Sequence, residues 1–286
     1  MRATIRGCRG SLAAPGPGTV RYGGNTSCVE VQTAGDALIV LDAGTGIRLL
    51  GLELEESCPP VIHLMLTHLH LDHLEGLGFF APLYIPEIEI HLWGPPSPVQ
   101  SLRARVERYL SPPLFPVELS DIPSRVMFHD VPEEPWEIGG ATISAAPLKH
   151  PGPTVGYRIE EEGRSIVYMP DHEPALGSDL RRVPPSWISG YDLAEGADVL
   201  MHDAQYTAEE YTERLGWGHS ALEHVVDFAL ITKVERLVMT HHDPNHDDDE
   251  LERMLAEARG MWGEGPGDLV LAREGMTIVP GEDVSP

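Results

Sequence analysis

Short apolar runs recur along the chain, and the segments between several of them keep apolar residues at helical spacing. Apolar runs of this length, bounded by turn-forming residues, are typical of strands. The strands predicted in this way cover residues 28–32, 37–41, 61–66, 88–93, 126–131, 142–148, 154–160, 165–169, 197–201 and 236–239. Helices are predicted over residues 47–55, 99–110 and 207–215, and from residue 247 to about residue 262.

Weaker signals complete this pattern. They predict a short edge strand over residues 3–7, a surface loop rich in glycine and proline over residues 10–24, and a short helix over residues 74–80. Ser220 and Glu223 have the spacing of a capping box, which would start a helix that runs to about residue 231. The turn-like residues 161–164 join the strands beside them as a hairpin, and residues 269–271 and 276–279 are predicted closing strands.

One polar stretch interrupts the apolar pattern. Residues 67–73 hold three histidines and one aspartate directly after the predicted strand 61–66, at the end of the strand where α/β folds place their sites. His68 and His70 would not share a helix face, but in an extended segment their rings point the same way. Asp72 and His73 follow and can point towards a second ion. Imidazole and carboxylate groups bind zinc, iron or manganese, so we favour a metal site over a polar loop that holds these histidines by chance.

The charge of the chain restricts its partners. A formal net charge of −25 and an isoelectric point near 4.8 argue against a broad surface for DNA or RNA. A small anionic substrate is still compatible with this negative charge, because two bound divalent cations would reverse the electrostatic potential at the site. The 286 residues, of which 42% are hydrophobic, are enough for the core of one large domain or two small ones.

The cysteines and the N-terminal residues indicate the cellular compartment that we expect for this protein. Cys8, Cys28 and Cys58 are odd in number and form no CxxC pair, which favours thiols in a reducing compartment. The N-terminal residues lack the apolar segment of a signal peptide, and no apolar run approaches the length of about eighteen residues that a membrane span needs. We therefore expect a cytoplasmic protein without a membrane segment.

The motif His-Leu-His-Leu-Asp-His at residues 68–73 resembles the HxHxDH signature of the metallo-β-lactamase superfamily. The resemblance implies an α/β fold in the form of a four-layer αββα sandwich, with a hydrolytic site for two metal ions. It also implies that residues 1–286 form a single domain of this type. The rest of the chain then has to supply the remaining metal ligands.

Five predicted strand ends carry histidine or aspartate, namely the 68–73 loop, His150, Asp171, the pair His202 and Asp203, and His241. Strand ends at one edge of a sheet converge, so these side chains can meet although they are far apart in sequence. The pattern resembles the ribonuclease Z and cyclic-nucleotide phosphodiesterase branch of the superfamily. For this chain the resemblance implies one metal ion held by His68, His70 and His150, a second held by Asp72, His73 and His241, and Asp171 as the bridge. Neutral histidines with a shared carboxylate suit Zn²⁺ or Mn²⁺.

Two further segments resemble the same branch. The run His-Asp-Ala-Gln at residues 202–205 is similar to its HEAT segment, and His-Ser-Ala at residues 219–221 is similar to its HST segment. This implies that His219, held by Asp203, protonates the leaving oxygen or stabilises the phosphoryl charge, while Asp72 accepts a proton as it binds metal. The alternative for His219 is an exposed loop histidine.

The sequence leaves the roles of several other residues open. Asp42 is either a turn former before Gly44 or, as in this superfamily, a partner that orients the histidine loop. Asn25 either caps a turn or lines the pocket. No role follows for His172, His242 or His246, and we expect a structural role for His63, His91, His129 and His224.

These features favour a phosphodiesterase that uses two metal ions to hydrolyse a small phosphodiester, with a cyclic nucleotide as the favoured substrate class. Gly78 and Ala81 depart from the signature of class II cyclic-nucleotide phosphodiesterases, so the substrate is not fixed. The alternative is a tRNA 3′-end endonuclease like ribonuclease Z. The net charge argues against a large RNA, and so does the short segment between His150 and Asp171, which holds no basic, glycine-rich arm.

Three other classes are less favoured. A thioester, lactone or β-lactam hydrolase would leave Asp203 and His219 without an evident role. A non-catalytic metal-binding or sensor protein on the same fold would be expected to have lost a ligand. A flavodiiron-type oxidoreductase would need a carboxylate where His70 stands, together with a flavin domain. The expected partner is a small phosphodiester substrate, a large nucleic acid is not expected, and a homodimer is left open.

Overall fold

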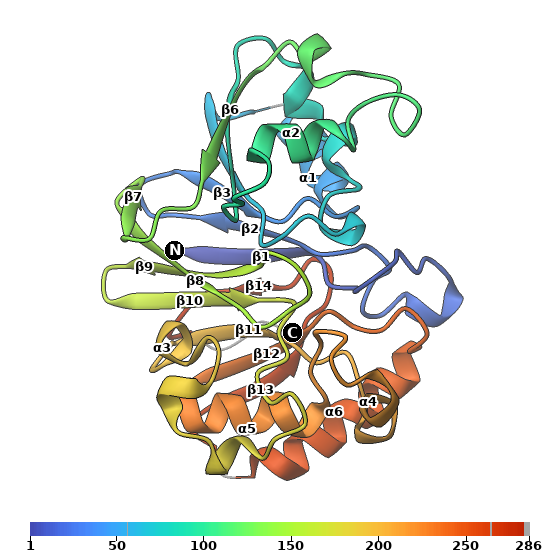
Figure 1. Ribbon diagram of the computed structural model, residues 1–286, viewed down its shortest axis with the longest axis vertical. Helices are drawn as coiled ribbons and strands as arrows, with labels where there is room; N and C mark the ends of the chain where they lie inside the picture. The colour runs from blue at the N-terminus through green and yellow to red at the C-terminus, as the bar shows by residue number, and fades with distance from the viewer. Residues whose placement is uncertain (56, 264, 283–286) are drawn as a thin grey trace.

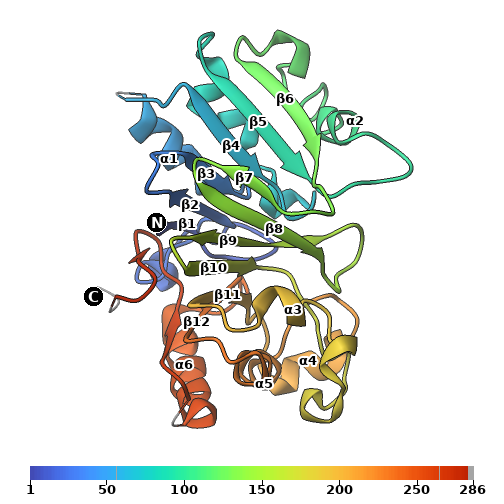
Figure 2. The ribbon, with the colours of Figure 1, turned by 90° about the vertical axis from the view of Figure 1, so that its left-hand side faces the viewer.

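Two seven-stranded sheets pack face to face with helices on their outer sides (Figure 1, Figure 2). This computed structural model describes residues 1–55, 57–263 and 265–282. The strand order is β14-β1-β2-β3-β4-β5-β6 in the first sheet and β13-β12-β11-β10-β9-β8-β7 in the second. The αββα sandwich predicted for an α/β chain is therefore confirmed.

The first sheet contains β1 (Arg2–Gly7), β2 (Cys28–Gln32), β3 (Leu38–Leu41), β4 (Val61–Met65), β5 (Glu89–Gly94), β6 (Arg125–Asp130) and β14 (Thr277–Ile278). The second contains β7 (Trp136–Ile138), β8 (Ala141–Pro147), β9 (Val155–Glu161), β10 (Arg164–Met169), β11 (Val199–Asp203), β12 (Arg236–Thr240) and β13 (Asp268–Leu271). The helices are α1 (Ile47–Leu54), α2 (Leu102–Glu107), α3 (Tyr191–Ala194), α4 (Ala208–Arg214), α5 (Leu222–Thr232) and α6 (Asp248–Trp262).

Three apolar layers hold the sandwich together. Between the sheets, alternate residues of facing strands such as Ile39 and Ile159 form one buried cluster. Because successive residues of a strand point to opposite faces, neighbours such as Val40 pack instead under α1 and α2. The third cluster lies between the second sheet and helices α3, α5 and α6. Strands β3, β10, β11 and β12 are thus buried on two faces, which explains their nearly continuous apolar sequence.

In the second sheet, the strands that precede the candidate ligands all run in the same direction. Strands β10, β11 and β12 are parallel neighbours, and β8 has the same direction because β9 pairs antiparallel with both β8 and β10. In the first sheet, β4 is parallel to β3 and β5. The carboxyl ends of β8, β10, β11 and β12 therefore reach one edge of the second sheet.

Several local predictions were wrong. The strand at the N-terminus is not an edge strand, because β14 pairs on its outer side and places Ala3 opposite Ile278. Within the short helix predicted over residues 74–80, only Leu77–Phe79 are helical, as a 3-10 helix. The helix expected over residues 99–110 is shorter, Leu102–Glu107, and the short strand β7 was not predicted.

The predicted capping box was also wrong. Helix α5 begins after Ala221 without a side-chain cap, because the Ser220 hydroxyl donates instead to the buried carbonyl of His172 at 2.7 Å. A capping box forms at α4, where Thr207 and Glu210 satisfy each other's backbone N–H groups. Ser220 and Glu223 have the same spacing as Thr207 and Glu210, and a tertiary contact decides which pair caps a helix. None of the helices in the described ranges is long and apolar enough to cross a membrane.

Candidate metal centre

Side chains from the predicted strand ends meet in one buried cluster. Ligand atoms within 4.8 Å of one another define one group of His68, His70 and His150, and another of Asp72, His73 and His241. Asp171 joins His68 and His73 in a third group, which connects the first two. The structure thus brings together all seven residues that the sequence nominated as metal ligands.

Acceptor groups outside the cluster fix the orientation of two histidines. Nδ1 of His73 lies 2.8 Å from the Asp42 carboxylate, and Nδ1 of His150 lies 2.8 Å from the carbonyl oxygen of Gly218. Both partners only accept hydrogen bonds, so Nδ1 carries the proton and, in the neutral ring, Nε2 presents a lone pair to the cluster. Hydrogen bonds of this kind orient histidines that bind metals.

His241 and His68 are oriented in the same way. Nδ1 of His241 lies 3.0 Å from Oε1 of Gln205. Nδ1 of His68 lies 3.1 Å from the Thr67 hydroxyl, which donates its own proton to Asp42 and therefore accepts from the ring. Four imidazoles consequently turn Nε2 towards the same space.

The inward-facing atoms fit cations. Nε2 of His73 lies 3.3 Å from Nε2 of His241, and Nδ1 of His70 lies 3.2 Å from Nε2 of His150. In the neutral rings neither Nε2 of His73 nor Nε2 of His241 carries a proton. Burial lowers the pKa of His73, but Asp171, Asp72 and Asp42 raise it more strongly, so a cation bound at Nε2 of His73 would replace a proton there. Burial lowers the pKa values of His68, His70 and His150, which favours the neutral form that binds metal. Nε2 of His68 is buried with no hydrogen-bond partner among the described residues, as expected of a ligand atom.

Asp171 lies between the two groups. One carboxylate oxygen is 2.9 Å from Nε2 of His73 and 3.4 Å from Nε2 of His241. The other is 3.7 Å from Nε2 of His150 and 3.8 Å from Nε2 of His68. Burial alone would raise the pKa of Asp171, but His241, His73 and His68 lower it, so the side chain is a carboxylate. Its two oxygens can therefore serve one ion each.

A backbone contact that was not predicted holds Asp72. Its carboxylate lies 3.2 Å from Nε2 of His241 and accepts the Ser11 backbone N–H at 2.7 Å. Gly10 packs against the same histidine, since a Cβ at Gly10 would lie 2.4 Å from Nδ1 of His241. The glycine-rich loop after β1 therefore closes one side of the cluster.

His219 is buried beside the cluster, which excludes the exposed loop histidine. Its Nδ1 lies 2.8 Å from the Asp203 carboxylate and 3.9 Å from Asp171, and its ring stacks on His241 with a centroid distance of 5.0 Å. Burial lowers the pKa of His219, but Asp203 raises it more strongly, to about 9. Backbone N–H groups of His172, Gln205 and Ser220 also donate to Asp203 and hold it in place.

The histidines without an assigned role stay outside the cluster. Nε2 of His242 donates to the Ala272 carbonyl, and His246 contacts Glu210 at 2.9 Å. His172 and His202 contact each other in the interior at 2.9 Å. Asn25 bonds to Glu274 rather than lining the site, whereas Asp42 belongs to it. Sequence reasoning did not identify Gln205, Gly218 and Ser11 as partners, since nothing near them in sequence indicates a ligand.

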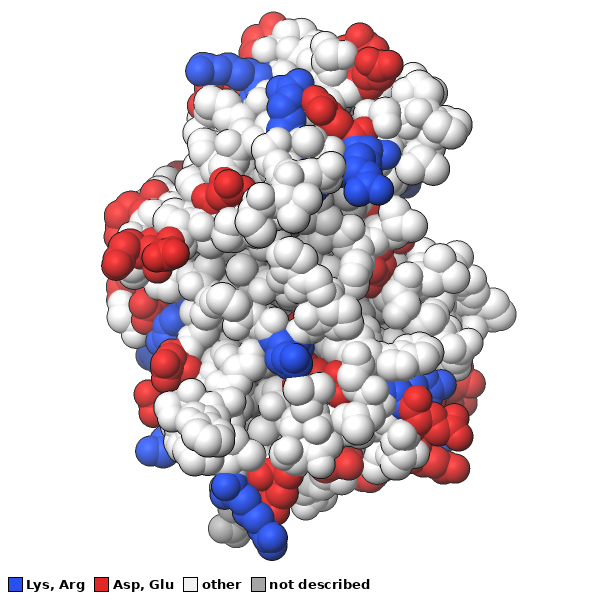
Figure 3. All heavy atoms as spheres, viewed as in Figure 1, with Lys and Arg blue, Asp and Glu red and all other residues white. Residues whose placement is uncertain are grey.

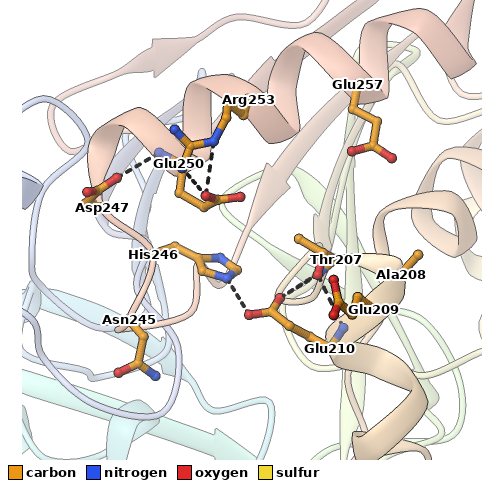
Figure 4. Close-up of a pocket in the computed structure, with 10 residues that line it drawn as sticks. All are labelled: Thr207, Ala208, Glu209, Glu210, Asn245, His246, Asp247, Glu250, Arg253 and Glu257. Carbon is orange, nitrogen blue, oxygen red and sulfur yellow. Dashed lines mark hydrogen bonds and ion pairs between the residues drawn. The ribbon is translucent and has the colours of Figure 1, made fainter.

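A separate hollow of about 540 Å³ lies between the N-terminal ends of α4 and α6 (Figure 4). It is lined by Glu209, Glu210, Asp247, Glu250 and Glu257, together with polar residues that include His246 and Arg253. Its predominance of carboxylates disfavours an anionic ligand. The histidine cluster is thus the better candidate for the functional site.

The fold and this cluster define a metal-dependent hydrolase with an αββα sandwich. Residues 38–242 match the family model described as "Beta-lactamase superfamily domain", and the chain belongs to this superfamily. It is 27% identical to a ribonuclease Z of Rippkaea orientalis, over 88% of this chain and 91% of that protein.

Solved structures share the fold. A diphosphatase from the PhnP family has a TM-score of 0.68 and 21% identity, with 99% of each chain covered. The short form of human tRNase Z has a TM-score of 0.65 and 21% identity, with 99% of this chain and 100% of that chain covered. The predicted membership of the metallo-β-lactamase superfamily is thus confirmed by the family model, and the similarity to a ribonuclease Z agrees with the resemblance seen in the sequence.

Proposed function

We propose that this protein hydrolyses a small phosphodiester with two divalent cations, Zn²⁺ or Mn²⁺, held by the histidine cluster. The observation that carries the proposal is the position of Asp171 between two groups of three ligands each. His68, His70 and His150 would hold one ion, Asp72, His73 and His241 the other, and Asp171 both. When bound, such a pair lowers the pKa of water and neutralises phosphoryl oxygens.

The residues of the chain have complementary tasks. Asp72 can accept a proton from the attacking water, since its carboxylate lies inside the second group. His219 can donate a proton to the leaving oxygen from Nε2, because Nδ1 is held by Asp203 at 2.8 Å. A general acid matters most when the leaving group is an alkoxide, which is a poor leaving group without a proton.

Several features favour a small substrate over a large RNA. The residues between His150 and Asp171 form the compact hairpin of β9 and β10, without an extended arm. The face in Figure 3 shows Lys and Arg scattered among Asp and Glu, with no continuous basic surface. Together with the net charge of −25, this disfavours binding of a polyanion. A cyclic nucleotide is the favoured class, and the ribonuclease Z relative supports tRNA 3′-end cleavage as the second candidate.

A substrate panel tests the proposal. Protein loaded with Zn²⁺ or Mn²⁺ would be assayed with bis-p-nitrophenyl phosphate, 2′,3′- and 3′,5′-cyclic nucleotides, precursor tRNA and nitrocefin. We expect turnover of the small phosphodiesters, its loss with chelator, and its loss in His70→Ala. His129→Ala, a change of the same type outside the cluster, serves as the matched control. Turnover of nitrocefin alone would remove the proposal, and faster cleavage of precursor tRNA would favour the second candidate.

A further inference from the structure

Glu173 is a buried carboxylate whose hydrogen bonds, among the described residues, go to none of the seven candidate ligands. It lies two residues after Asp171 and is 1% exposed. One oxygen accepts the Gly216 backbone N–H at 2.8 Å and the Tyr211 hydroxyl at 2.8 Å. The other accepts the Gly218 backbone N–H at 2.7 Å. All three donors belong to α4 or to the loop that follows it, so this carboxylate joins the end of β10 to that loop.

The loop fastened in this way leads directly to His219. Gly218 donates its N–H to Glu173, and its carbonyl oxygen accepts from Nδ1 of His150 at 2.8 Å. Glu173 also donates its own backbone N–H to the carbonyl of Lys149 at 2.9 Å. Gly218 is therefore held at its N–H by Glu173 and at its carbonyl by His150, a candidate metal ligand.

Apolar burial contributes little to holding this loop. Leu215 and Trp217 are 53% and 60% exposed, so their side chains do not anchor it in the core. Gly216 and Gly218 have φ angles of 86° and 93°, which side chains rarely adopt, and a Cβ at Gly218 would lie 2.3 Å from Nδ1 of His150. Hydrogen bonds consequently hold residues 216–218, from Glu173 on one side and from His150 on the other. Those to Glu173 form a tether and have a charged acceptor, and such bonds are the strong kind.

We propose that Glu173 is a positioning residue, whose carboxylate holds residues 216–218 so that His219 stands at the leaving oxygen. The catalytic part of this inference rests on the proposed function, and the structural part does not. A glutamine at this position keeps the shape of the side chain but turns an NH₂ group towards one of the donors. Glu173→Gln therefore breaks the tether with little change in packing.

Hydrogen exchange followed by mass spectrometry tests the tether without any substrate. We expect faster exchange of the backbone amides of residues 216–219 in Glu173→Gln, with unchanged exchange in β10, β11 and β12. Glu213→Gln changes an exposed glutamate of the neighbouring α4 and should leave the loop as in the wild type. Unchanged exchange of the loop in Glu173→Gln would overturn the tether, whatever the protein hydrolyses.

Leaving-group dependence tests the catalytic part. In Glu173→Gln, assayed with saturating metal, we expect kcat to fall about 10- to 100-fold for a cyclic nucleotide, whose leaving group is an alkoxide, with KM unchanged. The loss should be much smaller for bis-p-nitrophenyl phosphate, because nitrophenolate leaves without a proton. In a His219→Ala background the second change should add almost nothing. Equal losses on both substrates, or additive losses in the double variant, would overturn the positioning role.

The two experiments separate this inference from the proposed function. If the wild-type protein hydrolyses no phosphodiester, the proposed function fails, and with it the catalytic part of the inference. The exchange experiment still decides whether Glu173 holds the loop.

Discussion

The Asp42 carboxylate accepts a hydrogen bond from Nδ1 of His73 at 2.8 Å and the backbone N–H of Thr67 at 2.7 Å. Asp42 is fully buried at the end of β3, and Thr67 leads into the histidine loop after β4. A single side chain thus fixes both the start of the loop and the ring orientation of one candidate ligand. Asp42 is therefore an orienting partner and not only a turn former.

Asp42→Asn should weaken binding of divalent metal about 10- to 100-fold. An amide can turn its NH₂ group towards His73 and remove the acceptor that keeps the proton on Nδ1. Competition with a chromophoric chelator measures the affinity. Asp36→Asn, an identical change at an exposed loop position, is the control and should bind metal as the wild type does. Equal affinities for the two variants would contradict this role of Asp42.

His241→Ala should reduce the metal content from two ions per chain to one. The change removes one of three ligands from the group that contains Asp72 and His73, whereas the group of His68, His70 and His150 stays complete. Elemental analysis after dialysis against metal-free buffer measures the ratio. Retention of both ions would contradict the assignment of His241 as a ligand, and loss of both at once would show that the two groups do not bind independently.

Tyr157→Phe should lower the free energy of unfolding by about 1–3 kcal/mol. The fully buried Tyr157 hydroxyl on β9 donates to the carbonyl of Leu66 at 2.7 Å, across the two sheets and directly before the histidine loop. Without the hydroxyl that carbonyl loses its partner. Urea unfolding measures the change, and Tyr191→Phe, whose hydroxyl contacts the exposed Glu195, should stay within about 0.5 kcal/mol of the wild type. The same small effect in both variants would argue against this bond.

The stability of the wild type should fall as the pH drops from about 6.5 towards 4, in part through His63. Burial, and then the neighbouring His91 and His129, lower the pKa of His63 to about 4 in the folded chain, against the raising effect of Glu89. The unfolded chain takes up this proton near pH 6.5, so between the two values it binds more protons than the folded chain, and acid favours unfolding. His63→Phe should flatten the dependence of Tm on pH across this window and leave Tm at pH 8 nearly unchanged. Parallel curves for the two proteins would exclude His63 as a source of the acid sensitivity.

The sequence by itself determined most of the strands, their order along the chain and the residues that gather at the candidate metal centre. These follow from local patterns, because a buried strand shows as an apolar run and a ligand at its end shows as a polar residue directly after it. The histidines at positions 68, 70, 73, 150 and 241 were found in this way, as were Asp72 and Asp171.

Only the tertiary structure decided which groups form hydrogen bonds that orient those ligands. Gln205 supports His241, Gly218 supports His150, and Glu173 holds the loop of His219, although the members of each pair lie between 36 and 68 residues apart in the chain. Packing likewise decided that the Ser220 hydroxyl donates to a buried carbonyl instead of capping a helix. A hydrogen bond of about 3 Å depends on how two sheets and a loop pack against each other, and local sequence patterns carry no information on that packing.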